Sequence, residues 1–156
     1  MDVKLEKASE KDANAIFDIQ VNAFKPLLEK YKDYNTNPAN ESVDRVKTRI
    51  NFSNGGFYKI LFKDILVGAM CIFWKEDTQF WISPMFISPG YQGKGIAQKA
   101  IALIQEMFPQ AESWELRTIQ EEERNCYLYE KMGFQMVGDK RSLNENSTLI
   151  HYKKIC

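Results

Sequence analysis

The segment Ser-Pro-Gly-Tyr-Gln-Gly-Lys-Gly-Ile-Ala, residues 88–97, is the most informative part of this chain. An apolar run over residues 80–87 comes before it and predicts a strand, and an amphipathic pattern over residues 95–108 comes after it and predicts a helix. A glycine-rich turn from a strand into a helix directs several backbone N–H groups at one point, where the helix N-terminus adds positive potential. We therefore predict a turn that binds an anion such as phosphate.

Two familiar phosphate-binding motifs do not fit this turn. A Walker loop requires serine or threonine after its Gly-Lys pair, whereas Lys94 is followed by Gly95. The dinucleotide-binding motif Gly-x-Gly-x-x-Gly would require a third glycine at the position of Gln98. The pattern that remains is Gln-x-x-Gly-x-Ala over residues 92–97. On this motif alone, an ordinary strand–helix turn without a ligand stays open as the alternative.

A second motif, Asn-Cys-Tyr-Leu-Tyr-Glu-Lys-Met-Gly-Phe, occupies residues 125–134. Its spacing predicts a helix to Met132, ended by Gly133 and followed by a strand. Together the two motifs resemble the GNAT N-acetyltransferases, which pair a Gln/Arg-x-x-Gly-x-Gly/Ala loop for the pyrophosphate of acetyl-CoA with a Leu-Tyr-Glu-Lys-x-Gly-Phe segment. The resemblance covers roughly residues 80–140, and the first half of the chain matches only in the order of its elements.

The hydrophobic pattern along the whole chain predicts an α/β fold with a mixed sheet. Strands are expected over residues 3–8, 57–62, 65–74, 80–87, 113–118, 134–140 and 148–154, and helices over residues 10–24, 27–31, 42–52, 95–108 and 121–132. Pro26 is expected to separate the first two helices, and residues 142–147 are expected to form a polar loop. The resemblance implies the GNAT acyl-CoA N-acyltransferase fold, with splayed central strands and flanking helices, and a bulge at Ser83-Pro84 would help to open that gap. We expect a single domain over residues 1–156.

Composition excludes several classes of partner. The chain has no net charge, with 21 basic and 21 acidic residues, so nothing steers it to nucleic acid or to an anionic membrane. No apolar stretch approaches the roughly 18 residues of a membrane span, and the first residues lack the apolar core of a signal peptide. Cys71, Cys126 and Cys156 are odd in number and far apart, which fits neither a disulfide framework nor a metal site. We expect a cytoplasmic protein without a metal.

The resemblance implies acetyl-CoA as the cosubstrate and supplies candidate site residues. The cofactor-binding candidates are Phe86, Ile87, Gln92, Gly93, Lys94, Gly95, Ile96, Ala97 and Asn125. In the family, the residue at the position of Ile87 pairs its backbone with the pantetheine arm, and the tyrosine that matches Tyr129 protonates the leaving thiolate. Glu122 stands where many members have an asparagine that contacts the cofactor, so Asn125, one turn later, is assigned that contact.

The resemblance does not identify a general base, because the strand over residues 80–87 contains no carboxylate. Many members of the family place a glutamate on this strand. Glu76 and Asp77 lie in the turn before it. Ordered water leading to backbone carbonyls and His151, the only histidine, are the alternatives that stay open.

These observations predict transfer of acetyl from acetyl-CoA to a primary amine by direct attack, without a covalent enzyme intermediate. A small-molecule acceptor is favoured because the expected acceptor walls, residues 26–34 and 142–147, carry no long acidic track for a basic peptide. The alternatives are a non-catalytic acyl-CoA-binding or sensor module on the same fold and a protein N-acetyltransferase. A homodimer is left open.

Overall fold

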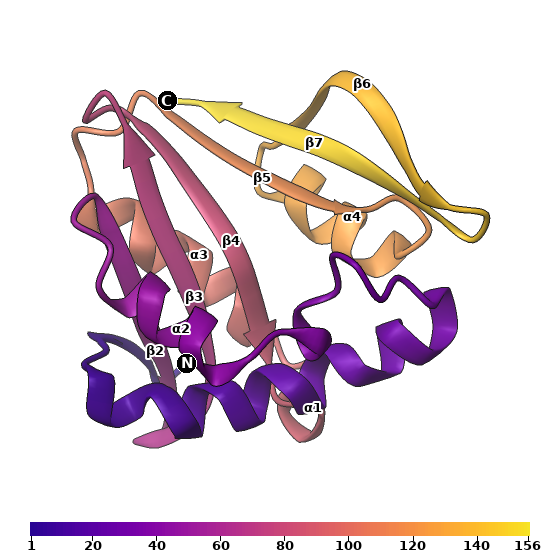
Figure 1. Cartoon of the computed structure of the whole chain (residues 1–156). Coiled ribbons are helices and arrows are strands. Elements are labelled where there is room, and N and C mark those ends of the chain that lie inside the picture. The colour runs from indigo at the N-terminus through magenta and orange to yellow at the C-terminus, as the bar shows by residue number, and fades with distance from the viewer.

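A single mixed sheet of seven strands forms the centre of the computed structural model, which describes residues 1–156 (Figure 1). The strands are β1 (Val3–Lys7), β2 (Gly55–Phe62), β3 (Ile65–Lys75), β4 (Gln79–Ile87), β5 (Ser113–Ile119), β6 (Gln135–Asn144) and β7 (Ser147–Ile155), and their order across the sheet is β1-β2-β3-β4-β5-β7-β6. The helices are α1 (Ala13–Tyr31), α2 (Val43–Ile50), α3 (Ile96–Met107) and α4 (Glu123–Lys131). The predicted fold class is confirmed.

Helices cover both faces of this sheet. On one face, α1 and α2 pack on β2, β3 and β4 around a core that includes Ile16, Val46 and Phe57. On the other face, α3 and α4 pack around a larger core with Trp114 at its centre. Figure 1 shows the first pair in front of the sheet and α3 behind it. None of the helices is both long and apolar enough to cross a membrane.

The sheet divides between β4 and β5, its only parallel pair of neighbours. Pairing is limited to residues 79–81 of β4 with residues 113–115 of β5. Beyond these pairs the two strands separate (Figure 1), and we call the gap between residues 82–87 of β4 and residues 116–119 of β5 the fork. In the pairing of β3 with β4, Met70 lies opposite Met85 and Ile72 lies opposite Ile82. Two residues of β3 are therefore matched by three residues of β4. The extra residue places a bulge at residues 83–84, as predicted, beside the point where the fork begins.

Two predictions about the elements are wrong. Pro26 does not divide the first helix, because α1 runs without a break to Tyr31. A proline removes the hydrogen bond to the carbonyl one turn earlier, but Asn22 and Pro26 are both exposed, so water can solvate the carbonyl that lost its donor. The predicted loop over residues 142–147 is also too long. Its first residues continue β6 as far as Asn144, and only the hairpin turn to β7 remains.

Candidate active site

The glycine-rich turn after β4 has the backbone conformation that its sequence predicts. Gly93 and Gly95 have φ angles of +75° and +83°, in the left-handed region that other residues rarely adopt. The side chain of Gln92 turns back and donates from Nε2 to the carbonyl oxygen of Ile87 at 2.9 Å. This bond fixes the start of the turn to the end of the strand, so the Gln92 side chain has a structural role in the loop.

A run of backbone N–H groups at this turn has no acceptor within the chain. The first helical hydrogen bond of α3 is donated by Lys99 to the carbonyl of Gly95 at 3.2 Å. The N–H groups from Gly93 to Gln98 therefore remain free, as expected at a helix N-terminus. This run includes the predicted Lys94, Ile96 and Ala97. Free N–H groups and the positive end of the helix together make a site for a phosphate group.

Arg124 adds a cation to this loop, and the sequence analysis did not identify it. Its Nη2 lies 3.2 Å from the position that a Cβ atom on Gly93 would occupy. Arg124 is in the first turn of α4, on the far side of the fork, so the loop and α4 form one site although they are distant in sequence. The available signal was a basic residue five positions before Tyr129. Asn125, its neighbour, is half-buried and its side chain makes no hydrogen bond within the chain.

The end of β4 offers an unpaired backbone edge to the fork. Ile87 pairs with Gly68 of β3 on one side and has no partner strand on the other. The side chains of Phe86 and Ile87 are both buried, and they point to opposite faces of the sheet. Any contact that these two residues make with a ligand in the fork therefore comes from their backbone, in the way that an added strand pairs with a sheet edge.

Tyr129 lies on α4 inside the core that also contains Ile87 and Ile96. Its ring packs against the rings of Phe134 and Tyr152, with centroids 6.1 and 6.0 Å away. Its hydroxyl makes no hydrogen bond within the chain. Burial of the side chain raises the pKa of this hydroxyl to about 12, so Tyr129 holds its proton at every physiological pH.

The open end of the fork is bridged by the end of α1. Glu122, at the start of α4, accepts hydrogen bonds from Lys30 Nζ at 3.0 Å and from the Tyr31 hydroxyl at 2.5 Å. Burial, followed by the bond to Glu122, raises the pKa of Tyr31. Asn144 of the β6–β7 hairpin donates from Nδ2 to the carbonyl of Tyr31 at 2.7 Å. The bond from Asn144 thus joins the two segments predicted as acceptor walls, and Glu122 ties the end of α1 to the start of α4.

A histidine–carboxylate pair lies beside the closed end of the fork. His151 Nε2 is 3.0 Å from Oε1 of Glu115, which belongs to the last pair between β4 and β5. The imidazole also stacks on Trp81, with centroids 5.1 Å apart and an interplanar angle of 22°. Glu76 and Asp77 are in the exposed β3–β4 turn, beyond the closed end of the fork. Of the candidate proton acceptors in the sequence, His151 is therefore the one held near the fork.

Cys71 and Cys126 are poor nucleophiles in this structure. All three cysteines are free thiols. Burial raises the pKa of Cys71 to about 12, and burial also raises the pKa of Cys126, beside the tyrosine motif. Since only the thiolate attacks, both side chains are unreactive near neutral pH.

The model of the acetyltransferase (GNAT) family matches residues 22–134, most of the chain, including the glycine-rich loop and the tyrosine motif. The chain belongs to the GNAT family. The predicted resemblance is confirmed, and with it the expectation of an acyltransferase. No curated protein sequence gives a significant match.

Solved structures of GNAT enzymes share this fold at low sequence identity. A ribosomal-protein-alanine N-acetyltransferase from Escherichia coli superposes with a TM-score of 0.79 at 11% identity, covering 98% of this chain and 93% of that one. The PaiA N-acetyltransferase from Thermoplasma acidophilum, in complex with coenzyme A, gives 0.77 at 13% identity and covers 100% of both chains. A spermidine N-acetyltransferase chimera from Vibrio cholerae and hSSAT gives 0.75 at 18% identity, with 99% and 96% covered. These likenesses confirm the GNAT fold.

Proposed function

We propose that the chain, as one domain over residues 1–156, transfers the acetyl group of acetyl-CoA to a primary amine of a small molecule. The observation that carries this proposal is the run of free backbone N–H groups from Gly93 to Gln98, with Arg124 beside it, at the mouth of a split sheet. Such a run suits the pyrophosphate of coenzyme A. The PaiA relative, which shares the fold, was solved with coenzyme A bound.

The fork sets the direction of the bound cosubstrate. With its pyrophosphate on the N–H groups of residues 93–98, the pantetheine arm would run back along the free edge of β4 from Ile87 toward Ser83. It would pair with the backbone there as an added strand does. The thioester then lies at the closed end of the fork, where β4 and β5 begin to separate. Lys94, Arg124 and Asn125 would contact the nucleotide part.

The transfer needs one proton acceptor and one proton donor. An alkyl amine has a pKa of about 10.4, so its ammonium form must lose a proton before the nitrogen attacks the thioester carbonyl carbon. We assign the role of proton acceptor to His151, whose Nε2 lies 3.0 Å from Glu115. When the tetrahedral intermediate collapses, the C–S bond breaks and the thiolate takes the hydroxyl proton of Tyr129. The nitrogen is positively charged after its attack, and its second proton returns the Tyr129 oxyanion to the hydroxyl form, while the proton on His151 leaves to solvent. The products are the N-acetyl amide and the free thiol of coenzyme A.

Replacement of the Tyr129 hydroxyl tests the catalytic part of this proposal. Because the hydroxyl makes no hydrogen bond within the chain, Tyr129→Phe should leave the fold and the affinity for coenzyme A unchanged while kcat falls about 100-fold. A general acid works only while protonated, so with a pKa of about 12 the wild-type rate should show no decline from Tyr129 below about pH 11. Thiol release from acetyl-CoA with a panel of amines measures both effects.

Tyr127→Phe is the matched control, since Tyr127 is exposed and faces another side of α4. It should retain wild-type turnover. Full turnover in Tyr129→Phe would reduce Tyr129 to a packing residue. A protein that binds coenzyme A and acetylates no amine would instead be the non-catalytic acyl-CoA-binding module that the sequence left open.

A further inference from the structure

A cavity of about 300 Å³ opens on the face of the sheet that carries α1 and α2. The lining residues come from α2, the segment after it, β3 and β4; they are Arg45, Arg49, Phe52, Asn54, Phe73 and Ser83. Ser83 is exposed within the bulge of β4, two residues beyond Trp81, the last residue of β4 that pairs with β5. The cavity therefore reaches the closed end of the fork, where the thioester of the proposed cosubstrate would lie.

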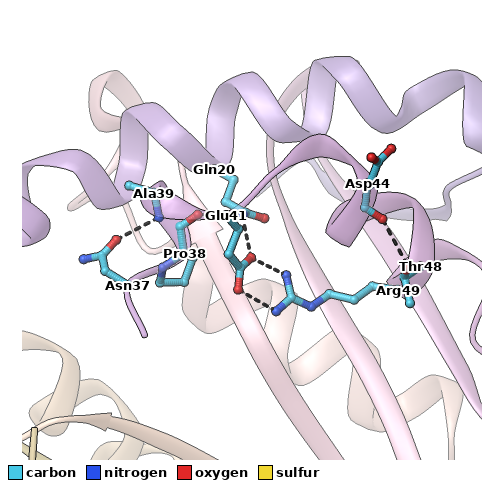
Figure 2. A network of polar contacts seen from close by, with 8 residues as sticks. All are labelled: Gln20, Asn37, Pro38, Ala39, Glu41, Asp44, Thr48 and Arg49. Carbon is cyan, nitrogen blue, oxygen red and sulfur yellow. Dashed lines mark hydrogen bonds and ion pairs between the residues drawn. The ribbon is translucent and has the colours of Figure 1, made fainter. Parts of the chain in front are cut away.

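The charge on the cavity wall is positive. Two arginines line it, and no carboxylate does. Arg49 is buried and forms a two-point ion pair with Glu41, from Nη1 at 2.6 Å and from Nη2 at 2.9 Å. Figure 2 shows Glu41 held between Arg49 and the amide of Gln20, which donates to it at 3.0 Å. Glu41 uses only two of the five N–H donors of Arg49, so others remain for a ligand.

Arg45 has no carboxylate partner in the chain. It lies one helical turn before Arg49 on the exposed side of α2. The Glu41–Arg49 pair is neutral as a unit, so the free charge of the wall is that of Arg45. Guanidinium groups bind carboxylate and phosphoryl oxygens in a forked geometry, whereas a cationic ligand would meet repulsion here.

Aromatic rings form the rest of the wall. Phe52 meets Phe73 edge to face with centroids 6.2 Å apart, and Phe73 stacks on Trp81 at 6.1 Å with an interplanar angle of 3°. Lys75 and Arg117 place further cations over the Trp81 ring, at 5.4 and 5.0 Å from its centroid. This surface can bind the carbon skeleton of a ligand while the cations around it favour a negative group.

We propose that this cavity, and not the space between residues 26–34 and 142–147 that the sequence suggested, binds the acceptor, and that the acceptor is a small amine carrying an oxyanion group, either a carboxylate or a phosphoryl group. Arg45 and the free N–H groups of Arg49 hold the oxyanion, and Phe52 and Phe73 hold the carbon skeleton. The amine then points toward Ser83 and the fork. This inference rests on the proposed acetyl transfer. It narrows the substrate class to amines that also carry an acidic group and predicts that polyamines are poor acceptors.

The test compares one amine skeleton in three forms that bear a carboxylate, a phosphonate or a neutral carboxamide. Wild-type protein should prefer an acidic form over the amide in kcat/KM, and the two acidic forms distinguish the two kinds of oxyanion. Arg45→Gln should lower the ratio of acid to amide about 10-fold, mainly through KM, because Arg45 acts in binding. Lys47→Gln is the matched control, an exposed cation on the same helix that does not line the cavity.

Calorimetric titration of the preferred acidic compound in the presence of coenzyme A provides a readout that does not need turnover. Arg45→Gln should weaken this binding about 10-fold, and Lys47→Gln should not. If the amide is acetylated as well as the acids, or if Arg45→Gln leaves the ratio unchanged, the inference is wrong while the acetyltransferase stands. If no amine is acetylated but the acid binds in a manner that depends on Arg45, the binding site stands and the proposed reaction is wrong.

Discussion

The phosphate loop can be tested by adding a single negative charge at Gly95. Gly95 is the N-cap of α3 with φ +83°, and a Cβ there would meet only the terminal methyl of Met1, at 3.3 Å. Asparagine enters this backbone region more readily than most residues, so Gly95→Asn should cost about 1–2 kcal/mol of stability. Gly95→Asp has nearly the same shape and adds a carboxylate where the pyrophosphate is proposed to bind.

The size of the effect follows from Coulomb's law. Two unit charges about 4 Å apart repel by about 1 kcal/mol in water and by about 4 kcal/mol near a protein surface. Gly95→Asp should therefore bind coenzyme A at least about 5-fold more weakly than Gly95→Asn, and the difference should shrink as salt is raised. Isothermal titration calorimetry at two salt concentrations measures it, with circular dichroism as the check on folding.

Gly138→Asp is the control for net charge. Gly138 also has a positive φ, +68°, but it lies in β6 and a Cβ on it would touch nothing within 4 Å. This variant should bind coenzyme A as the wild type does. Equal affinity of folded Gly95→Asp and Gly95→Asn would refute the assignment of the pyrophosphate to this loop.

Two further predictions concern the residues around the fork. Arg124→Gln should weaken coenzyme A binding several-fold, because a cation is lost beside Gly93. Lys131→Gln, at the other end of α4, should not weaken it. Equal affinities of the two variants in calorimetry would show that Arg124 does not contact the cofactor. His151→Gln should lower kcat/KM, mainly through kcat, because the proposed proton acceptor beside the fork is lost. Unchanged turnover in the folded variant would mean that ordered water accepts the proton instead.

Local signals predicted much of the fold and the backbone conformation of the glycine-rich loop. The Lys63-Asp64 turn between β2 and β3 follows from a break in the apolar alternation, and both residues adopt positive φ values in the structure. The loop was predictable because its conformation depends on glycines adjacent in sequence. Pro26 misled the analysis, since a local rule cannot tell whether the carbonyl that loses its donor is exposed to water.

The residues of the proposed acceptor cavity could not be identified from the sequence, because the cavity depends on the packing of distant elements. Arg45 and Arg49 are ordinary solvated cations in the helical pattern of α2, and only the packing of that helix beside β3 and β4 makes them a cavity wall. His151 and Glu115 are likewise separated in sequence, and the pairing of β5 with β7 brings them together. Such contacts leave no periodic signal in a single sequence.

The short ladder between β4 and β5 also limits how closely the two parts of the sheet are coupled. Backbone pairs join the two parts of the sheet only at residues 79–81 of β4, and the bonds of Glu122 to Lys30 and Tyr31 join them again at the far end. A pantetheine arm paired along the free edge of β4 would act as the missing strand. Two half-sheets linked at their ends would then become one continuous cooperative unit. The rigidity of the whole enzyme would rise and fall with the supply of its acyl donor.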